Sequence, residues 1–303
     1  MKLSRRTFIG ASVAAVAGLR HGEVLAGAAP GPDIVEATGA DPAALVKASL
    51  EALGGIGKFV RSGDYVVIKP NAGFANPAAW ATTTNPDVVA AIAKACLDAK
   101  AKQVLILEYP QAKADKCLER CGLNAALATV PQVKVKLLSA AGDFQKVEIK
   151  GGVALKSVEL AKALLSADVF INVPVAKHHY QAGVAFGLKN HMGLIQDRQS
   201  FHTMLDLHQA VADLGLVVKP HLTIVDATRA LLTNGPAGPG ETVVLNKLVA
   251  GRVVTSVDAY TLSLARFNQK QMTPADAKHI ELAAKAGLGA IDLAKLNVKK
   301  VTV

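Results

Sequence analysis

The chain has 303 residues, with 34 lysines and arginines against 24 aspartates and glutamates, which gives a formal net charge of +10. Hydrophobic residues make up 51% and charged residues 19%, a composition that excludes an intrinsically disordered chain. Three cysteines in this length are too few for a disulfide scaffold and exclude a four-cysteine iron–sulfur cluster.

Residues 1–28 have the pattern of a cleaved export signal. A basic start that ends in Arg5-Arg6 precedes an apolar run over residues 7–18, and small residues follow at 26–28. The apolar run is shorter than the about 20 residues that cross a bilayer, so we expect no stable membrane span. The paired arginines resemble a twin-arginine signal, with an ordinary secretory signal as the alternative. We therefore expect an exported, for example periplasmic, protein that uses the export machinery. Cleavage after Ala26 removes four basic residues and one acidic residue and leaves a charge of +7.

Helical and strand patterns alternate along residues 29–303. Apolar runs typical of buried parallel strands predict strands at 65–68, 104–107, 169–173 and 222–225, and a weaker edge strand is predicted at 133–138. Helices are predicted at 41–53, from the N-cap Asn85 onward, around Cys117, at 158–165 and at 199–216. Residues 243–245 and 253–254 predict a hairpin, followed by two helices and a strand at 298–303. This order predicts one α/β domain, a mostly parallel sheet flanked by helices with a small C-terminal hairpin-plus-helices extension.

Polar and charged side chains follow the predicted strands, where ligands bind in open α/β sheets. Lys69 and Asn71 follow one strand, Glu108 ends another, and a basic segment that starts at Lys177 follows a third. The residues that we expect to bind a small anionic substrate are Lys69, Asn71, Lys177, Arg198, Asp226, Thr228 and Arg229. Clustered lysines and arginines in a cleft favour a small anion over a polymer.

Four histidines lie within 25 residues of one another, in a glycine-rich segment and the helix predicted after it. The predicted metal ligands are His178, His179, His191 and His202. The predicted catalytic residues are His179, Lys189, His202 and Asp206. On one helix, His202 and Asp206 would be i, i+4 neighbours, a spacing at which a carboxylate can orient an imidazole. The alternative is a solvated helix face with an incidental pair, and we expect His208 on the apolar face to be a packed histidine.

Several motifs resemble the domain of unknown function 362 family over essentially the whole chain after the signal. The resemblance is carried by Lys69-Pro70-Asn71, residues 173–179, 187–193, 197–202 and 226–230, and Gly287-Leu288-Gly289. No activity is established for that family. Some of its members are iron–sulfur proteins with a cysteine-rich insert, and this chain lacks those cysteines, so the iron–sulfur label does not transfer.

A more distant similarity links the chain to the nickel-pincer lactate racemase family. That family has an Asp-x-Thr-Arg element, several histidines, and a lysine with a tethered cofactor ten residues after one histidine. Here Asp226, Thr228 and Arg229 match the element, and the interval from His179 to Lys189 matches the spacing. The order of the two segments is reversed in this chain. The similarity implies metal chemistry or a carboxylate substrate.

Two functional hypotheses follow from these residues. The first is an exported metal- or cofactor-dependent enzyme that acts on a small anionic substrate, with a transition metal possible and the cofactor unknown. The second is a non-catalytic metal- or anion-binding accessory protein of a periplasmic redox system. Export and an aromatic content of only 4% disfavour a nucleic-acid partner. Whether Cys117 and Cys121, four residues apart on a predicted helix, form a disulfide is left open.

Overall fold

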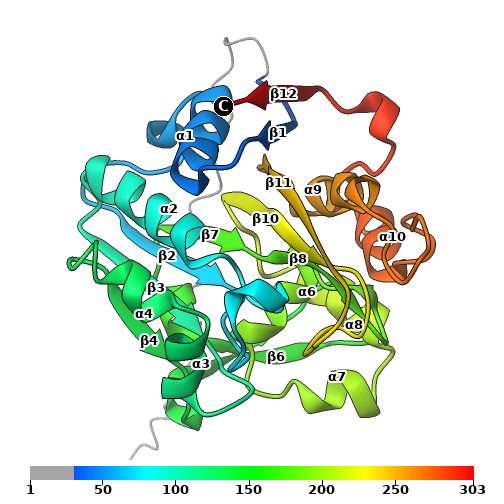
Figure 1. Cartoon of the computed structure of the whole chain (residues 1–303). Helices are drawn as coiled ribbons and strands as arrows, with labels where there is room; N and C mark the ends of the chain where they lie inside the picture. Colours follow the sequence, from blue (N-terminus) through cyan, green and yellow to red (C-terminus); the bar gives the residue numbers. More distant parts are fainter. Residues whose placement is uncertain (1–30) are drawn as a thin grey trace, which may run out of the picture.

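A computed structural model describes residues 31–303, so the predicted signal at 1–28 lies outside the described residues. The strands, in the order of Figure 1, are β1 (Ile34–Thr38), β2 (Tyr65–Pro70), β3 (Gln103–Glu108), β4 (Lys134–Leu137), β5 (Phe144–Glu148), β6 (Ser157–Ala161), β7 (Val169–Val173), β8 (Val175–His179), β9 (Gly183–Val184), β10 (Leu222–Leu231), β11 (Thr242–Gly251) and β12 (Val298–Thr302). The α-helices are α1 (Pro42–Ala52), α2 (Pro86–Asp98), α3 (Ala114–Arg120), α4 (Leu123–Leu127), α5 (Lys162–Leu165), α6 (Gly187–Asn190), α7 (Gln199–Thr203), α8 (Leu207–Leu214), α9 (Val254–Thr261) and α10 (Lys278–Lys285).

The central sheet has the strand order β12-β1-β11-β10-β7-β2-β3-β4. The pairs β1–β12, β10–β7, β7–β2, β2–β3 and β3–β4 are parallel, whereas β11 runs antiparallel to both β1 and β10. Strand β8 continues from β7 and pairs with β10 and with the short β9. The protein is therefore an α/β fold with a mostly parallel sheet, as the alternating sequence pattern predicts.

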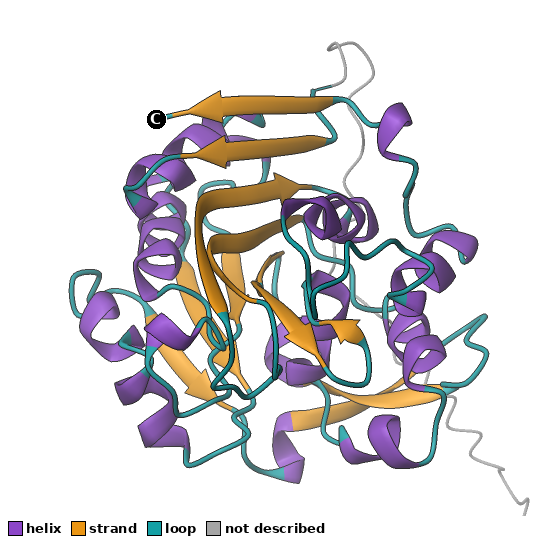
Figure 2. Ribbon diagram, turned by 45° about the vertical axis from the view of Figure 1, so that its right-hand side comes forward, coloured by secondary structure: helices purple, strands orange, loops and turns teal. Residues whose placement is uncertain are grey.

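Helices cover both faces of the sheet, as Figure 2 shows. Successive side chains of a strand point to opposite faces. Val66 and Ile68 of β2 accordingly belong to the apolar cluster that includes residues of α1 and α2. Val67, between them, belongs to the cluster that includes residues of α6, α8 and α9. A sheet covered on both faces leaves the ends of its strands as the place where a site can form.

Two predicted helices differ from the structure. The segment predicted as a helix at 158–165 begins as strand β6, which pairs with β5, and only Lys162–Leu165 is helical. Its buried residues alternate along the strand, which is a two-residue period. The helix predicted at 199–216 is broken into α7 and α8. Asp206 is the N-cap of α8, with an extended backbone and a side chain that accepts hydrogen bonds from the amides of His208 and Gln209.

The C-terminal part contains the predicted strand and helices, but its turn lies elsewhere. Residues 242–251 form one strand, β11, which pairs with β10 on one side and β1 on the other. Val253 is not in a strand; it precedes α9 as its N-cap. The antiparallel hairpin is thus formed by β10 and β11. Strand β1 is absent from the sequence prediction because its five residues, Ile34–Thr38, include a charged glutamate and lie close to the signal region.

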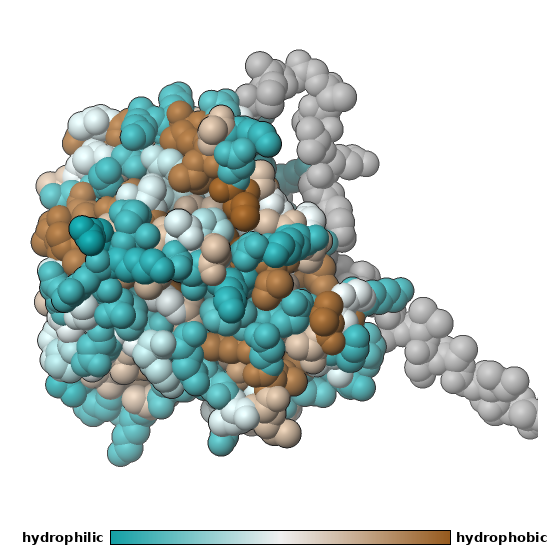
Figure 3. All heavy atoms as spheres, turned by 90° about the vertical axis from the view of Figure 1, so that its right-hand side faces the viewer, coloured by the Kyte–Doolittle hydropathy of each residue, from teal (hydrophilic) through white to brown (hydrophobic). Residues whose placement is uncertain are grey.

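Within residues 31–303, no helix has both the length and the apolar character that crossing a bilayer requires. On the face of the molecule turned toward the viewer in Figure 3, hydrophobic residues form separate areas with hydrophilic residues between them.

Candidate functional site

A cavity of about 520 Å³ opens at the carboxyl ends of the parallel strands. The strand register brings the end of β2 beside the end of β7, with Lys69 opposite Asn172 and Pro70 opposite Val173. Four basic side chains line the cavity, namely Lys69, Lys177, Lys189 and Arg198. Glu108, at the end of β3, also lines it. The topology therefore collects charges from distant segments at one edge of the sheet, as expected for this class of fold.

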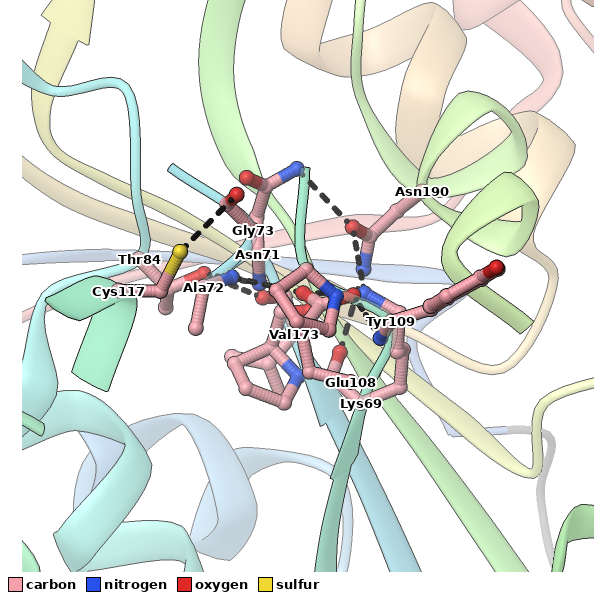
Figure 4. Close-up of polar contacts among 12 residues, drawn as sticks. Lys69, Asn71, Ala72, Gly73, Thr84, Glu108, Tyr109, Cys117, Val173 and Asn190 are labelled. Carbon is pink, nitrogen blue, oxygen red and sulfur yellow. Dashed lines mark hydrogen bonds and ion pairs between the residues drawn. The ribbon is translucent and has the colours of Figure 1, made fainter. Parts of the chain in front are cut away.

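A buried ion pair joins β2 to β3 at the floor of the cavity. The Lys69 Nζ lies 2.8 Å from Glu108 Oε2, and the two side chains are 1% and 3% exposed. Glu108 also accepts hydrogen bonds from the backbone amides of Ala72 and Tyr109, each at 2.8 Å (Figure 4). Burial lowers the pKa of Lys69, and the charge of Glu108 opposes that effect. The carboxylate therefore holds three donors in place at once.

Asn190, at the end of α6, connects this ion pair to the neighbouring strand. Its Nδ2 donates to Lys69 O at 3.2 Å and to Asn172 Oδ1 at 2.8 Å. Its Oδ1 accepts from Lys69 Nζ at 3.3 Å and from Asn71 Nδ2 at 3.2 Å. Figure 4 shows Asn190 facing Asn71 and Lys69 across this network. Because every polar atom of the Asn190 amide is used, α6 is fixed relative to β2 and β7.

Two further residues fix the segment that carries Lys189 and Asn190. The buried carboxylate of Asp258 accepts hydrogen bonds from the amides of Gly187 and Leu188, both at 2.8 Å, at the start of α6. Burial raises the pKa of Asp258 to about 7, although these two hydrogen bonds oppose the rise. Gly193 packs directly on the ion pair, since a Cβ there would lie 2.5 Å from Lys69 Cε and 2.6 Å from Glu108 Oε1.

Lys177 reaches the cavity from β8 without a carboxylate beside it. Its Nζ donates to Thr82 O at 2.6 Å and to Asn71 Oδ1 at 3.2 Å, and it lies 4.6 Å from the centre of the Phe74 ring. The residue is 1% exposed. Burial lowers the pKa of Lys177 to about 7. The charge of Glu108 opposes that effect, whereas the positive charges of Lys69 and Lys189 add to it. The ammonium form is therefore only partly populated near neutral pH.

Lys189 and His202 meet inside the same cavity. The Lys189 Nζ lies 3.0 Å from Met192 Sδ and 3.5 Å from His202 Nε2. Burial, followed by the charge of Arg198, lowers the pKa of Lys189 to about 7. The other ring nitrogen of His202, Nδ1, faces Gln181 Oε1. A proton on Nδ1 satisfies that carbonyl and leaves Nε2 as the acceptor that faces Lys189. Burial and the charge of Lys189 lower the pKa of His202 to about 4.

His179 stacks on His202 but uses its Nδ1 elsewhere. The two rings are parallel within 3°, with centroids 5.6 Å apart. The Nδ1 atom accepts hydrogen bonds from the amides of Gln181 and Ala182, both at 3.2 Å. The neutral ring therefore carries its proton on Nε2. Burial and the charge of Lys189 lower the pKa of His179 to about 2, so the ring stays neutral.

The four histidines predicted as metal ligands are not brought together. His178 does not line the cavity, and its Nδ1 accepts from the amide of Gly235 at 3.1 Å. His191 is buried below the site, with its Nε2 3.3 Å from Asn172 Nδ2, and burial lowers its pKa to about 3. Over residues 31–303, no group of three or more histidine, cysteine, aspartate or glutamate side chains is arranged to hold a metal ion. Since His179 also has its proton on Nε2, the described residues do not fit a metal ion at the predicted set.

Of the remaining predicted site residues, Arg198 lines the cavity and Asp206 does not. The Arg198 guanidinium donates to Tyr109 O at 2.7 Å and Pro110 O at 3.2 Å and stacks 4.0 Å from the Tyr109 ring. Asp206 is exposed and caps α8, so it does not orient His202. His208, predicted to be packed, is half-buried and stacks on His279.

Asp226, Thr228 and Arg229 lie outside the cavity lining. The buried Asp226 accepts from the amide of Asn85 at 2.7 Å and from the Thr228 hydroxyl at 2.7 Å. Burial raises the pKa of Asp226. These contacts hold the start of α2 against β10, so Asp226 and Thr228 stabilise the fold and do not face the cavity. Arg229 lies on the same strand, β10, and is half-buried.

The sequence places Glu108 at the edge of the site without a role, and it omits three further residues that organise the cavity, namely Asn172, Asn190 and Asp258. Glu108 ends an apolar strand, which is a usable signal in the sequence. Asn190 lies inside the motif at 187–193 without a feature that separates it from Lys189. The position of Asp258, 70 residues from the amide it binds, depends on the tertiary fold alone.

All three cysteines are buried free thiols, so Cys117 and Cys121 do not form a disulfide in this structure. The Sγ of Cys117 lies 3.3 Å from Gly73 O, behind a loop that lines the cavity (Figure 4). The Sγ of Cys121 lies 3.6 Å from Leu118 O in its own helical segment.

Comparisons with known proteins identify relatives. The model of the family described as "Domain of unknown function (DUF362)" matches residues 66–263. The thylakoid-associated protein sll1697 of a Synechocystis species is 27% identical over 260 residues, which cover 81% of this chain and 75% of that protein. The structure of the lactate racemase apoprotein from Thermoanaerobacterium thermosaccharolyticum aligns with a TM-score of 0.47 and 13% identity, over 72% of this chain. This chain spans 54% of that racemase, and so weak a likeness carries no argument about function. Because the family model covers well over half of its length, the chain belongs to the DUF362 family.

Proposed function

We propose that the chain is an enzyme that binds a small anionic substrate in the cavity and moves a proton on it. The observation that carries the proposal is the state of Lys177 and Lys189. Both side chains are less than a tenth exposed, both line the cavity, and neither forms an ion pair with any carboxylate of residues 31–303. A buried ammonium group is unfavourable unless an opposite charge compensates it. A bound anion supplies that charge.

Three basic residues provide the binding site in this proposal. Lys177 presents its ammonium group from β8, and Lys69 is held in place by Glu108. Arg198 gives two of its N–H groups to backbone carbonyls, which fixes the plane of the guanidinium and leaves its other donors for a carboxylate or phosphate. These positive charges also stabilise negative charge that develops on the substrate.

Lys189 and His202 provide the acid–base pair. Near pH 7 a fraction of Lys189 is the neutral amine, which accepts a proton from a group of the substrate next to its anion. The electron pair left by that proton stays on the substrate, beside the positive charges of Lys69 and Lys177. His202 Nε2, 3.5 Å from Lys189 Nζ, can take the proton onward or return it. The sequence-based prediction that the enzyme depends on a cofactor stays a prediction.

Solvent deuterium exchange tests this function. A panel of small carboxylic acids and phosphate esters is incubated in heavy water with the protein, and deuterium in the substrate is followed by NMR. We expect exchange with the wild type, binding but no exchange with Lys189→Met, and slowed exchange with His202→Gln. Lys116→Met, a change at an exposed lysine, is the matched control. Binding to the wild type without exchange of any substrate would refute the catalytic role and favour the anion-binding accessory protein.

We also propose that the protein acts after export, on the basis of the pattern in residues 1–28, which include the twin arginines Arg5 and Arg6. Replacement of both arginines by lysine should leave the full-length protein in the cytoplasm of its host, whereas the wild type is recovered outside it. Equal export of the two proteins would show that the twin-arginine route is not used.

A further inference from the structure

The cavity is larger than an anionic head group needs. Its volume of about 520 Å³ lies within the range of about 300–1,000 Å³ that is usual for pockets of small organic ligands. A carboxylate on a chain of one or two carbons occupies a small part of that space. The remaining volume has to be filled by another part of the substrate or by water.

The lining of the cavity combines polar and charged residues with a smaller set of apolar and aromatic ones. Beside the lysines and Arg198 it contains Phe74, Tyr180, Met192 and Pro236. Ligand pockets commonly combine an apolar wall with a few polar groups that fix orientation. The apolar residues therefore offer a surface to a part of the substrate that carries no charge.

Three flat rings stand in a row at one side of the cavity. His179 lies between His202 and Tyr180, parallel to the first within 3° and to the second within 14°, with centroid distances of 5.6 Å and 5.2 Å. Tyr180 is the outermost ring and is 69% exposed. Its backbone is nevertheless fixed, because its amide donates to Gly235 O at 3.1 Å. An exposed aromatic ring that lines a cavity is a surface on which another ring can stack.

We propose that the substrate is an aromatic acid, an anionic group joined to a flat aromatic body. This inference rests on the proposed function and adds the class of substrate. The anion lies among Lys69, Lys177 and Arg198, next to Lys189, and the aromatic body stacks on the row of rings that ends at Tyr180. Offset stacking and burial of the ring both strengthen binding.

A series of acids with one head group tests the proposal. Calorimetry with the full-length protein measures the affinities of propionate, 3-cyclohexylpropionate and 3-phenylpropionate. We expect 3-phenylpropionate to bind at least tenfold more tightly than propionate and roughly threefold more tightly than the cyclohexyl acid, because only the phenyl ring stacks. Phenyl phosphate and methyl phosphate give the same comparison for a phosphate head group.

Variants of Tyr180 separate stacking from burial. Tyr180→Leu should remove the preference for the phenyl over the cyclohexyl acid, and Tyr180→Ala should also reduce the preference over propionate. Val153→Ala, at another exposed apolar residue outside the cavity lining, is the control and should change neither. Equal affinities for all acids of the series would overturn this proposal and leave the proposed function intact. If no anion of either series binds, the proposed function itself is refuted, and this inference with it.

Discussion

Replacement of Glu108 by glutamine should destabilise the protein strongly, and more so at low pH. The change leaves the Lys69 ammonium group buried among uncharged partners, since Glu108 is the carboxylate at 2.8 Å from its Nζ. Removal of one partner of a buried ion pair costs about 3–5 kcal/mol. Because proteins are stable by only about 5–15 kcal/mol, a loss of that size should shift unfolding to a clearly lower denaturant concentration.

The pH dependence follows from the buried lysine. Without Glu108, burial lowers the pKa of Lys69 further below its value of about 10.4 in the unfolded chain. Between those two pKa values the unfolded state binds more protons, so the stability of the variant rises with pH. Urea unfolding of wild type and variant at pH 6, 7, 8 and 9 should therefore show a deficit that shrinks as the pH rises.

The matched control is Glu119→Gln, which breaks the exposed Lys116–Glu119 pair and should leave the stability unchanged. The double variant Lys69→Met, Glu108→Gln should recover part of the loss, because no buried charge is left unpaired. A Glu108→Gln protein as stable as the wild type at every pH would refute the view that this ion pair organises the floor of the cavity.

Three further predictions concern packing, protonation and the thiols. Gly193→Ala should lower the free energy of unfolding by about 1–3 kcal/mol, because its Cβ would lie within 2.6 Å of Lys69 and Glu108. Gly142→Ala, with open space around it, is the control and should leave stability unchanged. Equal unfolding midpoints for the two variants would contradict this prediction. Both ring nitrogens of the buried His279 lack a hydrogen-bond partner, and burial lowers its pKa to about 3, so the unfolded chain binds the extra proton below pH 6.5. His279→Phe should gain about 2 kcal/mol relative to the wild type when urea unfolding is measured at pH 5 instead of pH 7.5, and an unchanged difference would refute this. Thiol labelling under non-reducing conditions should detect the three free thiols only after unfolding, because all three are buried in the native protein. Burial raises the pKa of Cys96 to about 12 and also raises the pKa values of Cys117 and Cys121, so that few reactive thiolates are present. An intact protein mass lower by two hydrogens would reveal a disulfide instead.

The sequence predicts the sheet and the edge where the cavity lies, because buried parallel strands are continuous apolar runs. The runs at 65–68 and 169–173 are such strands, and the polar residues after them, Lys69 and Lys177, do reach the cavity. Periodicity fails where side chains compete with helix formation. Asp206 caps α8 and breaks the helix that would have placed it beside His202.

The sequence also fails to separate a strand-end residue that faces the cavity from one that fixes the fold. Asp226 follows an apolar run as Lys69 does, yet it binds the amide of Asn85, 141 residues away. Asp226 differs from Lys69 because α2 docks against β10, a contact that depends on the tertiary fold. The same holds for His191, whose burial against Asn172 cannot be seen from its place in a histidine-rich segment.

The central claim is that a bound anion supplies the negative charge that the buried Lys177 and Lys189 lack, and proton uptake on binding measures it most directly. Because their pKa values are about 7, both amines are mostly neutral at pH 8, and a bound anion raises these pKa values. Calorimetric titration with 3-phenylpropionate at pH 8, in buffers of different ionisation enthalpy, should show uptake of roughly one to two protons for each bound anion. Lys189→Met should take up about one proton fewer. Binding heats that do not depend on the buffer would contradict the claim.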